Sequence, residues 1–183
     1  VFCGSAVNMQ ALDMLLFNME KLLPSPAHAE GIPPENADGE MVELHCKSDE
    51  PTAAYVFKTV ADPFVGKMSY LRVVSGRVTA GMSLVNARTG DTEKLGKPMF
   101  ICGKKQIDTD EICAGDIGAV AKMVSARTGD TFCDPSRVVS LDAPVFPQPS
   151  FSMAVTVAKK GDEGKISSAL ARLMEEDPTL SYE

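Results

Sequence analysis

The chain has 183 residues, 44% of them hydrophobic and 23% charged, with a formal net charge of −7 at pH 7. These proportions are ordinary for a soluble globular protein, and no apolar run approaches the roughly 20 residues that a membrane-spanning helix needs. A net negative charge argues against indiscriminate nucleic-acid binding, because the phosphate backbone repels acidic surfaces.

The negative charge is unevenly distributed along the chain. Residues 1–50 carry a net charge of −7, residues 51–147 carry +2, and residues 148–183 carry −2. The central segment is therefore the only part with a positive balance, and it permits a small RNA contact there. Scattered, solvated lysines and arginines are the simpler explanation for any single residue.

The first 50 residues predict a strand end, a helix and a linker. Residues 1–3 resemble the end of a buried strand without the positive flank of a signal peptide, and we expect them to continue a longer protein. An amphipathic helix follows, and Pro24 and Pro26 end it. The linker, residues 27–50, is rich in Pro, Gly, Ala and acidic residues and is expected to wrap the surface. The apolar face of the helix consists of Leu12, Leu15, Leu16, Met19, Leu22 and Leu23.

Residues 51–147 predict a β-barrel, closed or nearly closed, built from short strands separated by turns. Tyr55 and Phe57 begin an alternation typical of one strand, and residues 68–74 alternate in the same way to give its neighbour. In the S-G-R-V-T-A-G run that follows, Gly76 and Gly81 stand where a barrel strand turns sharply and passes close to a neighbouring backbone.

An internal repeat lies in this central segment. The hexapeptide A-R-T-G-D-T occurs at residues 87–92 and again at residues 126–131. Each copy places a Thr-Gly-Asp turn between apolar strands, so two chemically similar hairpins explain the repeat better than a duplicated binding site does.

Residues 148–183 predict one strand and one helix. Residues 151–157 alternate between apolar and small or polar side chains, which is typical of a strand. This unit has no partner strands, so its edge and its apolar stripe would favour self-association. The stripe on the predicted helix consists of Ile166, Leu170, Leu173 and Met174, and the helix is expected to end before Asp177.

The sequence contains no familiar catalytic set. No G-x-x-x-x-G-K-[ST] phosphate-binding loop is present, and His28 and His45 do not assemble a convincing Ser-His-Asp or Cys-His site. The five cysteines are scattered without a C-x-x-C pair, which predicts reduced, mostly buried thiols and no metal site. We therefore expect no catalytic residue, no metal ion and no cofactor in this fragment.

Several motifs, in order, resemble those of elongation factor G, the translational GTPase that drives ribosomal translocation. Residues 57–81, FKTVADPFVGKMSYLRVVSGRVTAG, closely resemble its second domain, and G-D-I at residues 115–117 is similar to a later strand of that domain. C-G-S-A at residues 3–6 resembles the fifth GTPase sequence element, and E-E-D-P-T at residues 175–179 resembles the end of the first helix of the third domain. One departure is Ala11, where the family often carries glycine.

The resemblance implies a mainly β fold class: a translation-factor-type β-barrel with an N-terminal helix and a partial ferredoxin-like α+β unit at the C-terminus. Residues 1–26 would be the last strand and helix of a GTPase domain, and residues 27–50 the linker arm. Residues 51–147 would be the β-barrel second domain, and residues 148–183 the incomplete start of the third domain.

The resemblance also implies a role in protein synthesis in the cytoplasm. The parent would use GTP and Mg²⁺, whereas this fragment would be a non-catalytic part whose barrel contacts small-subunit ribosomal RNA and relays the nucleotide state between its own GTPase domain and third domain. The guanine-binding remnant would be Gly4, Ser5 and Ala6. The candidate phosphate contacts, chosen because they lie near predicted turns, are Arg72, Arg77, Lys94, Lys97, Lys104 and Lys105.

Two other interpretations stay open at this point. One is a ribosomal protection protein conferring tetracycline resistance, or a translocase paralogue with a changed role, because these share the same barrel. The other, of a different class, is a stand-alone β-barrel adaptor that binds RNA or protein without any GTPase.

Overall fold

A computed structural model of the chain describes residues 1–28, 34–36, 39–62, 65–157, 161 and 163–182. The chain divides into two compact units, residues 1–30 and residues 31–183. Each unit is described by itself below.

The first unit contains one helix, α1 (Leu12–Leu22), as its leucine spacing predicts. The residue before it, Ala11, adopts the left-handed conformation with φ 59°, a backbone shape that costs a residue with a Cβ atom about 1 kcal/mol and a glycine almost nothing. The replacement of glycine noted in the sequence therefore leaves a strained helix start. None of the α1 side chains is buried, so its apolar face has no cover within this unit.

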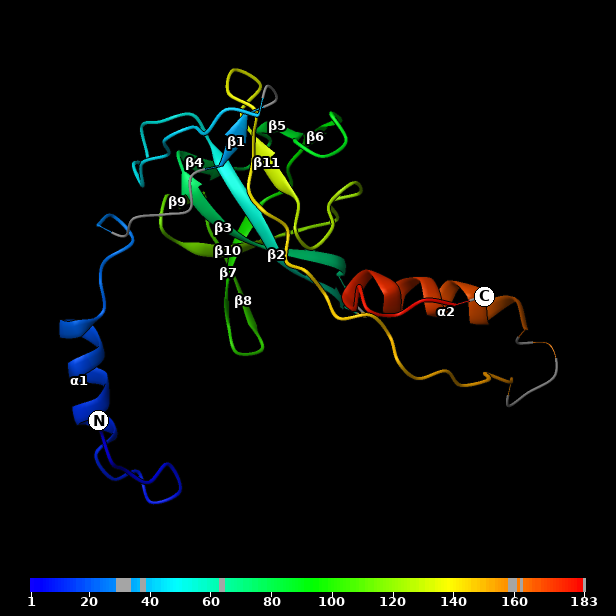
Figure 1. The fold of residues 1–183 in the computed structure, drawn as a ribbon, viewed down its shortest axis with the longest axis horizontal. Coiled ribbons are helices and arrows are strands. Elements are labelled where there is room, and N and C mark those ends of the chain that lie inside the picture. Colours follow the sequence, from blue (N-terminus) through cyan, green and yellow to red (C-terminus); the bar gives the residue numbers. More distant parts are fainter. Residues whose placement is uncertain (29–33, 37–38, 63–64, 158–160, 162, 183) are drawn as a thin grey trace. The chain divides into compact units, whose positions relative to one another are not determined.

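The second unit is mainly β, as predicted. Its largest element is an eight-stranded antiparallel sheet with the strand order β6-β5-β11-β2-β3-β10-β7-β8 (Figure 1). Its strands are β2 (Ala53–Asp62), β3 (Gly66–Ser75), β5 (Ser83–Asn86), β6 (Thr92–Lys94), β7 (Pro98–Cys102), β8 (Lys105–Asp108), β10 (Ile117–Ala121) and β11 (Thr131–Cys133). Two short ribbons accompany it: β1 (Glu35–Asn36) with β12 (Val139–Ser140), and β4 (Arg77–Thr79) with β9 (Glu111–Cys113).

Of the two forms expected from the sequence, a closed or a nearly closed barrel, the closed form is not present. Among the described strands, hydrogen-bonded pairing ends at β6 on one side and at β8 on the other, and these two do not pair. Closure requires every strand to be paired on both sides. Here β4 and β9 pair with each other in a separate ribbon, so they do not bridge the two ends of the large sheet.

The core lies against the inner face of the sheet, where the predicted alternation of β3 is confirmed. Leu71 and Val73 are fully buried, whereas Arg72 between them is exposed. A cluster of apolar side chains from most of the strands forms this core, and Phe132 of β11 is its largest fully buried member. Burial of such side chains contributes about 1.5–3 kcal/mol each and dominates the stability of the unit.

The linker arm covers a second, smaller cluster. Val42 and Leu44 of the arm pack against Ala53, Cys133 and Val139, in agreement with an arm that wraps the surface. Cys133 is the only buried cysteine of the five, so the prediction of mostly buried thiols is wrong. Its Sγ lies 3.0 Å from the Val139 carbonyl oxygen, and burial raises the pKa of this thiol.

The C-terminal strand predicted at residues 151–157 is not formed. This segment has no pairing partner among the described strands, and Phe151, Met153 and Val155 are exposed; an isolated strand has nothing to accept its backbone hydrogen bonds. The helix is confirmed as α2 (Glu163–Glu176). It lies against β2, where the Glu176 carboxylate accepts a hydrogen bond from the Ala61 amide. Neither described helix is long and apolar enough to cross a bilayer.

Gly76 and Gly81 both have positive φ, 71° and 76°, but they differ in their surroundings. A Cβ atom at Gly76 would lie 2.6 Å from the Glu50 carbonyl oxygen and from the Thr52 Cα. At Gly81 the nearest atom is the Lys94 Cε, at 3.6 Å. The predicted close approach of backbones therefore exists at Gly76 only, and Gly81 is needed for its turn alone.

We expect Gly76→Ala to lower the free energy of unfolding by about 2–4 kcal/mol, because it adds a backbone clash to the left-handed strain. The matched control, Gly81→Ala, has the same strain without the clash and should lose about 1 kcal/mol. Urea denaturation of the two variants measures the difference. Equal losses would show that the packing around Gly76 yields easily.

Candidate nucleic-acid interface

The six candidate phosphate contacts are all exposed, but the structure does not gather them into one patch. Lys94 lies in β6 and Lys105 in β8, and these two strands stand at opposite ends of the sheet order. The expectation that all six lie near turns is also wrong, because Arg72 is in the middle of a strand. The positions are Arg72 in β3, Arg77 at the start of β4, Lys94 at the end of β6, Lys97 between β6 and β7, Lys104 in the β7–β8 turn, and Lys105 at the start of β8.

Two of the six are engaged within the protein. The Arg77 Nη1 atom lies 2.9 Å from a carboxylate oxygen of Glu111, and its Nε donates to the Ser48 carbonyl oxygen at 3.1 Å. The Lys97 ammonium lies 3.1 Å from a carboxylate oxygen of Asp108. These carboxylates partly neutralise the charges that a phosphate would meet, so Arg77 and Lys97 are the weaker candidates.

Lys104 and Lys105 are the stronger candidates. They occupy the tip of the β7–β8 hairpin, which projects from the sheet (Figure 1). Neither makes an ion pair with a described residue, and all of β8 is exposed. An exposed hairpin tip with two adjacent cations can reach a phosphate backbone without rearrangement of the sheet.

Arg72 lies in a different setting, at the centre of the sheet on its outer face. Its direct cross-strand neighbours are Tyr55 of β2 and Ile117 of β10. Lys58 of β2 is exposed on the same sheet and was missed by the sequence analysis. Regular alternation predicts that Phe57 and Lys58 point to opposite faces of the strand. The register shift between Val56 and Lys58 leaves both side chains exposed instead.

The loop that the family resemblance assigns to guanine binding forms hydrogen bonds within itself. The Ser5 amide donates to the Gln10 carbonyl oxygen at 3.2 Å, and the Ser5 hydroxyl accepts a hydrogen bond from the Asn8 amide, also at 3.2 Å. One of the amides that the family resemblance assigns to the base is therefore already satisfied. Gly4 is needed for close packing, because a Cβ atom there would lie 2.8 Å from the same Gln10 oxygen.

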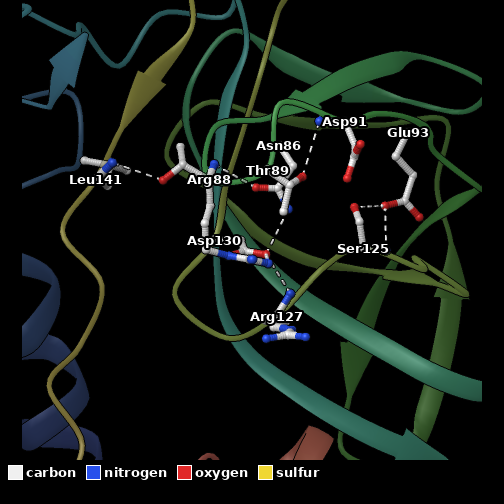
Figure 2. A network of polar contacts seen from close by, with 10 residues as sticks. Asn86, Arg88, Thr89, Asp91, Glu93, Ser125, Arg127, Asp130 and Leu141 are labelled. Carbon is white, nitrogen blue, oxygen red and sulfur yellow. Dashed lines mark hydrogen bonds and ion pairs between the residues drawn. The ribbon is translucent and has the colours of Figure 1, made fainter. Parts of the chain in front are cut away.

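The two copies of the repeat join each other through a buried carboxylate, a contact that the sequence analysis did not identify (Figure 2). Asp130 of the second copy is 4% exposed and receives a two-pronged ion pair from Arg88 of the first copy, with N–O distances of 2.6 and 2.9 Å. The Asn86 side-chain amide and the Arg127 backbone amide also donate to Asp130, each at 2.9 Å.

The repeat is therefore not a pair of equivalent hairpins. The first copy does form the β5–β6 hairpin, whereas the second is a loop that leads into β11, a strand that pairs with β2 and β5. Asp91, the counterpart of Asp130 in the first copy, is exposed. The duplicated sequence thus gives one exposed and one buried aspartate, and the buried one links the two loops.

The environment of Asp130 favours its charged form. Burial acts to raise the pKa of this carboxyl, but the hydrogen bonds from Arg88, Asn86 and the Arg127 amide outweigh it and hold the pKa below its usual range. Within the described residues, no group of three or more His, Cys, Asp or Glu side chains is placed to hold a metal ion.

Comparison with known proteins identifies the family. Residues 51–135 match the model of elongation factor G domain 2, and residues 146–183 match the model of elongation factor G domain III. A crystal structure from Thermus thermophilus is 28% identical, with a TM-score of 0.71, over 94% of this chain and 24% of that one. The chain belongs to the elongation factor G family, and it spans about a quarter of the length of this solved relative.

We expect Asp130→Asn to lower the free energy of unfolding at pH 7 by about 2–4 kcal/mol, because it removes the charge that four donors share. The matched control is Asp91→Asn at the equivalent, exposed position, which should change stability by less than about 0.5 kcal/mol. Urea denaturation of both variants measures the difference.

The pH dependence gives a second readout for Asp130. Its pKa is lower in the folded than in the unfolded chain, so its stabilisation is complete above the unfolded value of about 4 and is lost as the pH falls through the folded value. The deficit of Asp130→Asn should therefore shrink below about pH 4. A deficit that stays constant with pH would show that packing, and not charge, carries the effect.

Proposed function

We propose that this chain is the non-catalytic central fragment of an elongation-factor-G-like translational GTPase, whose parent couples GTP hydrolysis to ribosomal translocation in the cytoplasm. The observation that carries the proposal is the succession of two family domains, domain 2 followed by domain III, in one chain. The parent would bind GTP and Mg²⁺ through segments that this chain does not include.

In this proposal the eight-stranded sheet and its hairpins, called the sheet unit below, make the contact with the small ribosomal subunit. The support comes from the distribution of charge: residues 51–147 are the only segment with a net positive balance, and the Lys104–Lys105 tip is exposed and unpaired within the described residues. A contact through so few cations would be weak by itself and would act together with the rest of the parent.

The sheet unit would also transmit the nucleotide state to the third domain. The support is the position of α2, which belongs to the domain III segment and packs against β2 of the domain 2 sheet. Glu176 at the C-terminal end of α2 accepts a hydrogen bond from Ala61 at the end of β2. A displacement of the sheet would therefore also displace α2, because the two are in direct contact.

We expect the isolated chain to show no saturable binding of GTP or GDP. Base-facing amides supply only a small part of nucleotide affinity, which depends mostly on a phosphate-binding loop and Mg²⁺, and the Ser5 amide already bonds to Gln10. Isothermal calorimetry with each nucleotide measures this. Micromolar, saturable binding would mean that the remnant loop reorganises into a complete site.

Neutralising the hairpin tip with Lys104→Gln and Lys105→Gln should weaken binding of the full-length parent to the small ribosomal subunit and lower the salt slope of log K by about 1–2. The matched control removes the same charge at the two ion-paired cations, Arg77→Gln and Lys97→Gln, and should have a smaller effect. Sedimentation binding assays over a range of salt concentrations compare the two pairs. If both pairs behave alike, the tip has no special role.

A further inference from the structure

The outer face of β2 and β3 carries two aromatic side chains in contact. Phe57 is 38% exposed, and Tyr70 is half-buried. Their ring centroids lie 6.4 Å apart with an interplanar angle of 62°, an edge-to-face arrangement. Tyr70 therefore supports Phe57 from the side and leaves part of the Phe57 ring accessible to solvent.

A β-bulge produces this exposure. Between Val56 and Lys58 the register of β2 against β3 shifts by one residue, so that Val56 pairs with Leu71 and Lys58 pairs with Tyr70. In a regular strand one of two successive side chains would point inward, but Phe57 and Lys58 are both exposed. Bulges re-aim side chains in this way and are enriched next to binding sites.

Two cations accompany the exposed ring. Lys58 stands opposite Tyr70, and Arg72 is two residues further along the same face of β3. Neither has an ion-pair partner among the residues that the structure describes. Acidic groups lie on either side of this stretch of β2. Burial and, to a lesser extent, Asp142 raise the pKa of Tyr55, the direct neighbour of Arg72, and Glu176 of α2 accepts a hydrogen bond from the Ala61 amide. Between them, in the two cross-strand pairs Tyr55–Arg72 and Lys58–Tyr70, the charged side chains are both cations.

We propose that this face binds an unpaired RNA base, with Phe57 as the stacking surface and with Lys58 and Arg72 as contacts for the flanking phosphates. The inference rests on the proposed function and specifies how the sheet unit would meet RNA. Exposed aromatic rings on a sheet face, bordered by cations, are the arrangement by which proteins hold single-stranded RNA, because every base offers a π-face and every linkage a negative charge.

The charge of the face decides the choice of partner. A purely apolar protein segment would gain nothing from Lys58 and Arg72, and it would have to desolvate both. An RNA strand satisfies the aromatic ring and the two cations together. The site thus needs one splayed base and two adjacent phosphates, which a loop or a bulge in a folded RNA provides.

The chain contains no tryptophan, which allows a direct test. In the full 183-residue chain, Phe57→Trp keeps a stacking surface and adds the only indole fluorophore. We expect a short oligouridylate to quench its fluorescence saturably at low salt. The same oligonucleotide with abasic sites, which has the same phosphates, should leave the fluorescence unchanged. The control variant, Phe151→Trp, lies at an exposed position in neither proposed RNA contact and should show no saturable quenching with either probe.

Affinity measurements separate stacking from other contacts. Phe57→Ala should weaken oligouridylate binding about 5- to 150-fold, and Phe57→Leu should weaken it by a similar factor because leucine has no π-face. Lys58→Gln and Arg72→Gln should each reduce the salt slope by about 1. Because Phe57 is exposed, these variants should keep the circular dichroism spectrum of the parent chain.

Three outcomes would overturn the inference. They are equal quenching by the abasic probe, equal quenching of the Phe151→Trp variant, and full binding by Phe57→Leu, the last of which would favour an apolar protein segment as the occupant. Its failure can be told apart from failure of the proposed function. If small-subunit binding of the full-length parent still depends on Lys104 and Lys105 while Phe57→Trp is not quenched, the ribosomal contact stands and only the base site is wrong.

Discussion

Asp130 bonds to both neighbours of β11 at once, to the β5 side through its buried carboxylate and to β2 through its backbone carbonyl. Its side chain receives the hydrogen bonds of Asn86 and Arg88, at the end of β5 and just beyond it. Its carbonyl oxygen accepts the Val56 amide of β2 at 2.9 Å, and Val56 in turn accepts the Gly129 amide at 2.7 Å. The remaining strands, β3, β10, β7 and β8, follow in order from β2, so Asp130 helps to join the β6–β5 end of the sheet to the rest of it.

The same constraint reaches the outer surface. Val56, whose backbone amide and carbonyl bond to Asp130 and Gly129, is the last residue of β2 before the register shift. The bulge that turns Phe57 and Lys58 outward therefore begins next to a residue whose backbone is held by two hydrogen bonds. A surface built in this way is preorganised, since the side chains that meet a partner are oriented by backbone hydrogen bonds that exist before the partner arrives.

The spacing of apolar residues predicted the elements that depend only on residues close together in the sequence. The leucine spacing gave α1, the alternation at residues 68–74 gave the two faces of β3, and the apolar stripe gave α2. The separation of the sheet ends could not be predicted, because it depends on which distant strands share hydrogen bonds. Asp91 and Asp130 show the limit most clearly: they lie in identical hexapeptides, yet only one is buried. The bulge at Phe57 was equally hidden, since it arises from the pairing of β2 with β3.

The buried thiol of Cys133 can be used to measure local unfolding around β11. The thiol lies in β11, in the cluster against which the arm residues Val42 and Leu44 pack, and burial raises its pKa. Both its access to solvent and its conversion to the reactive thiolate are therefore suppressed while the thiol stays buried in this cluster. A slow alkylating reagent would react with this cysteine only during local unfolding of β11, so the rate of labelling would measure the free energy of that opening under native conditions.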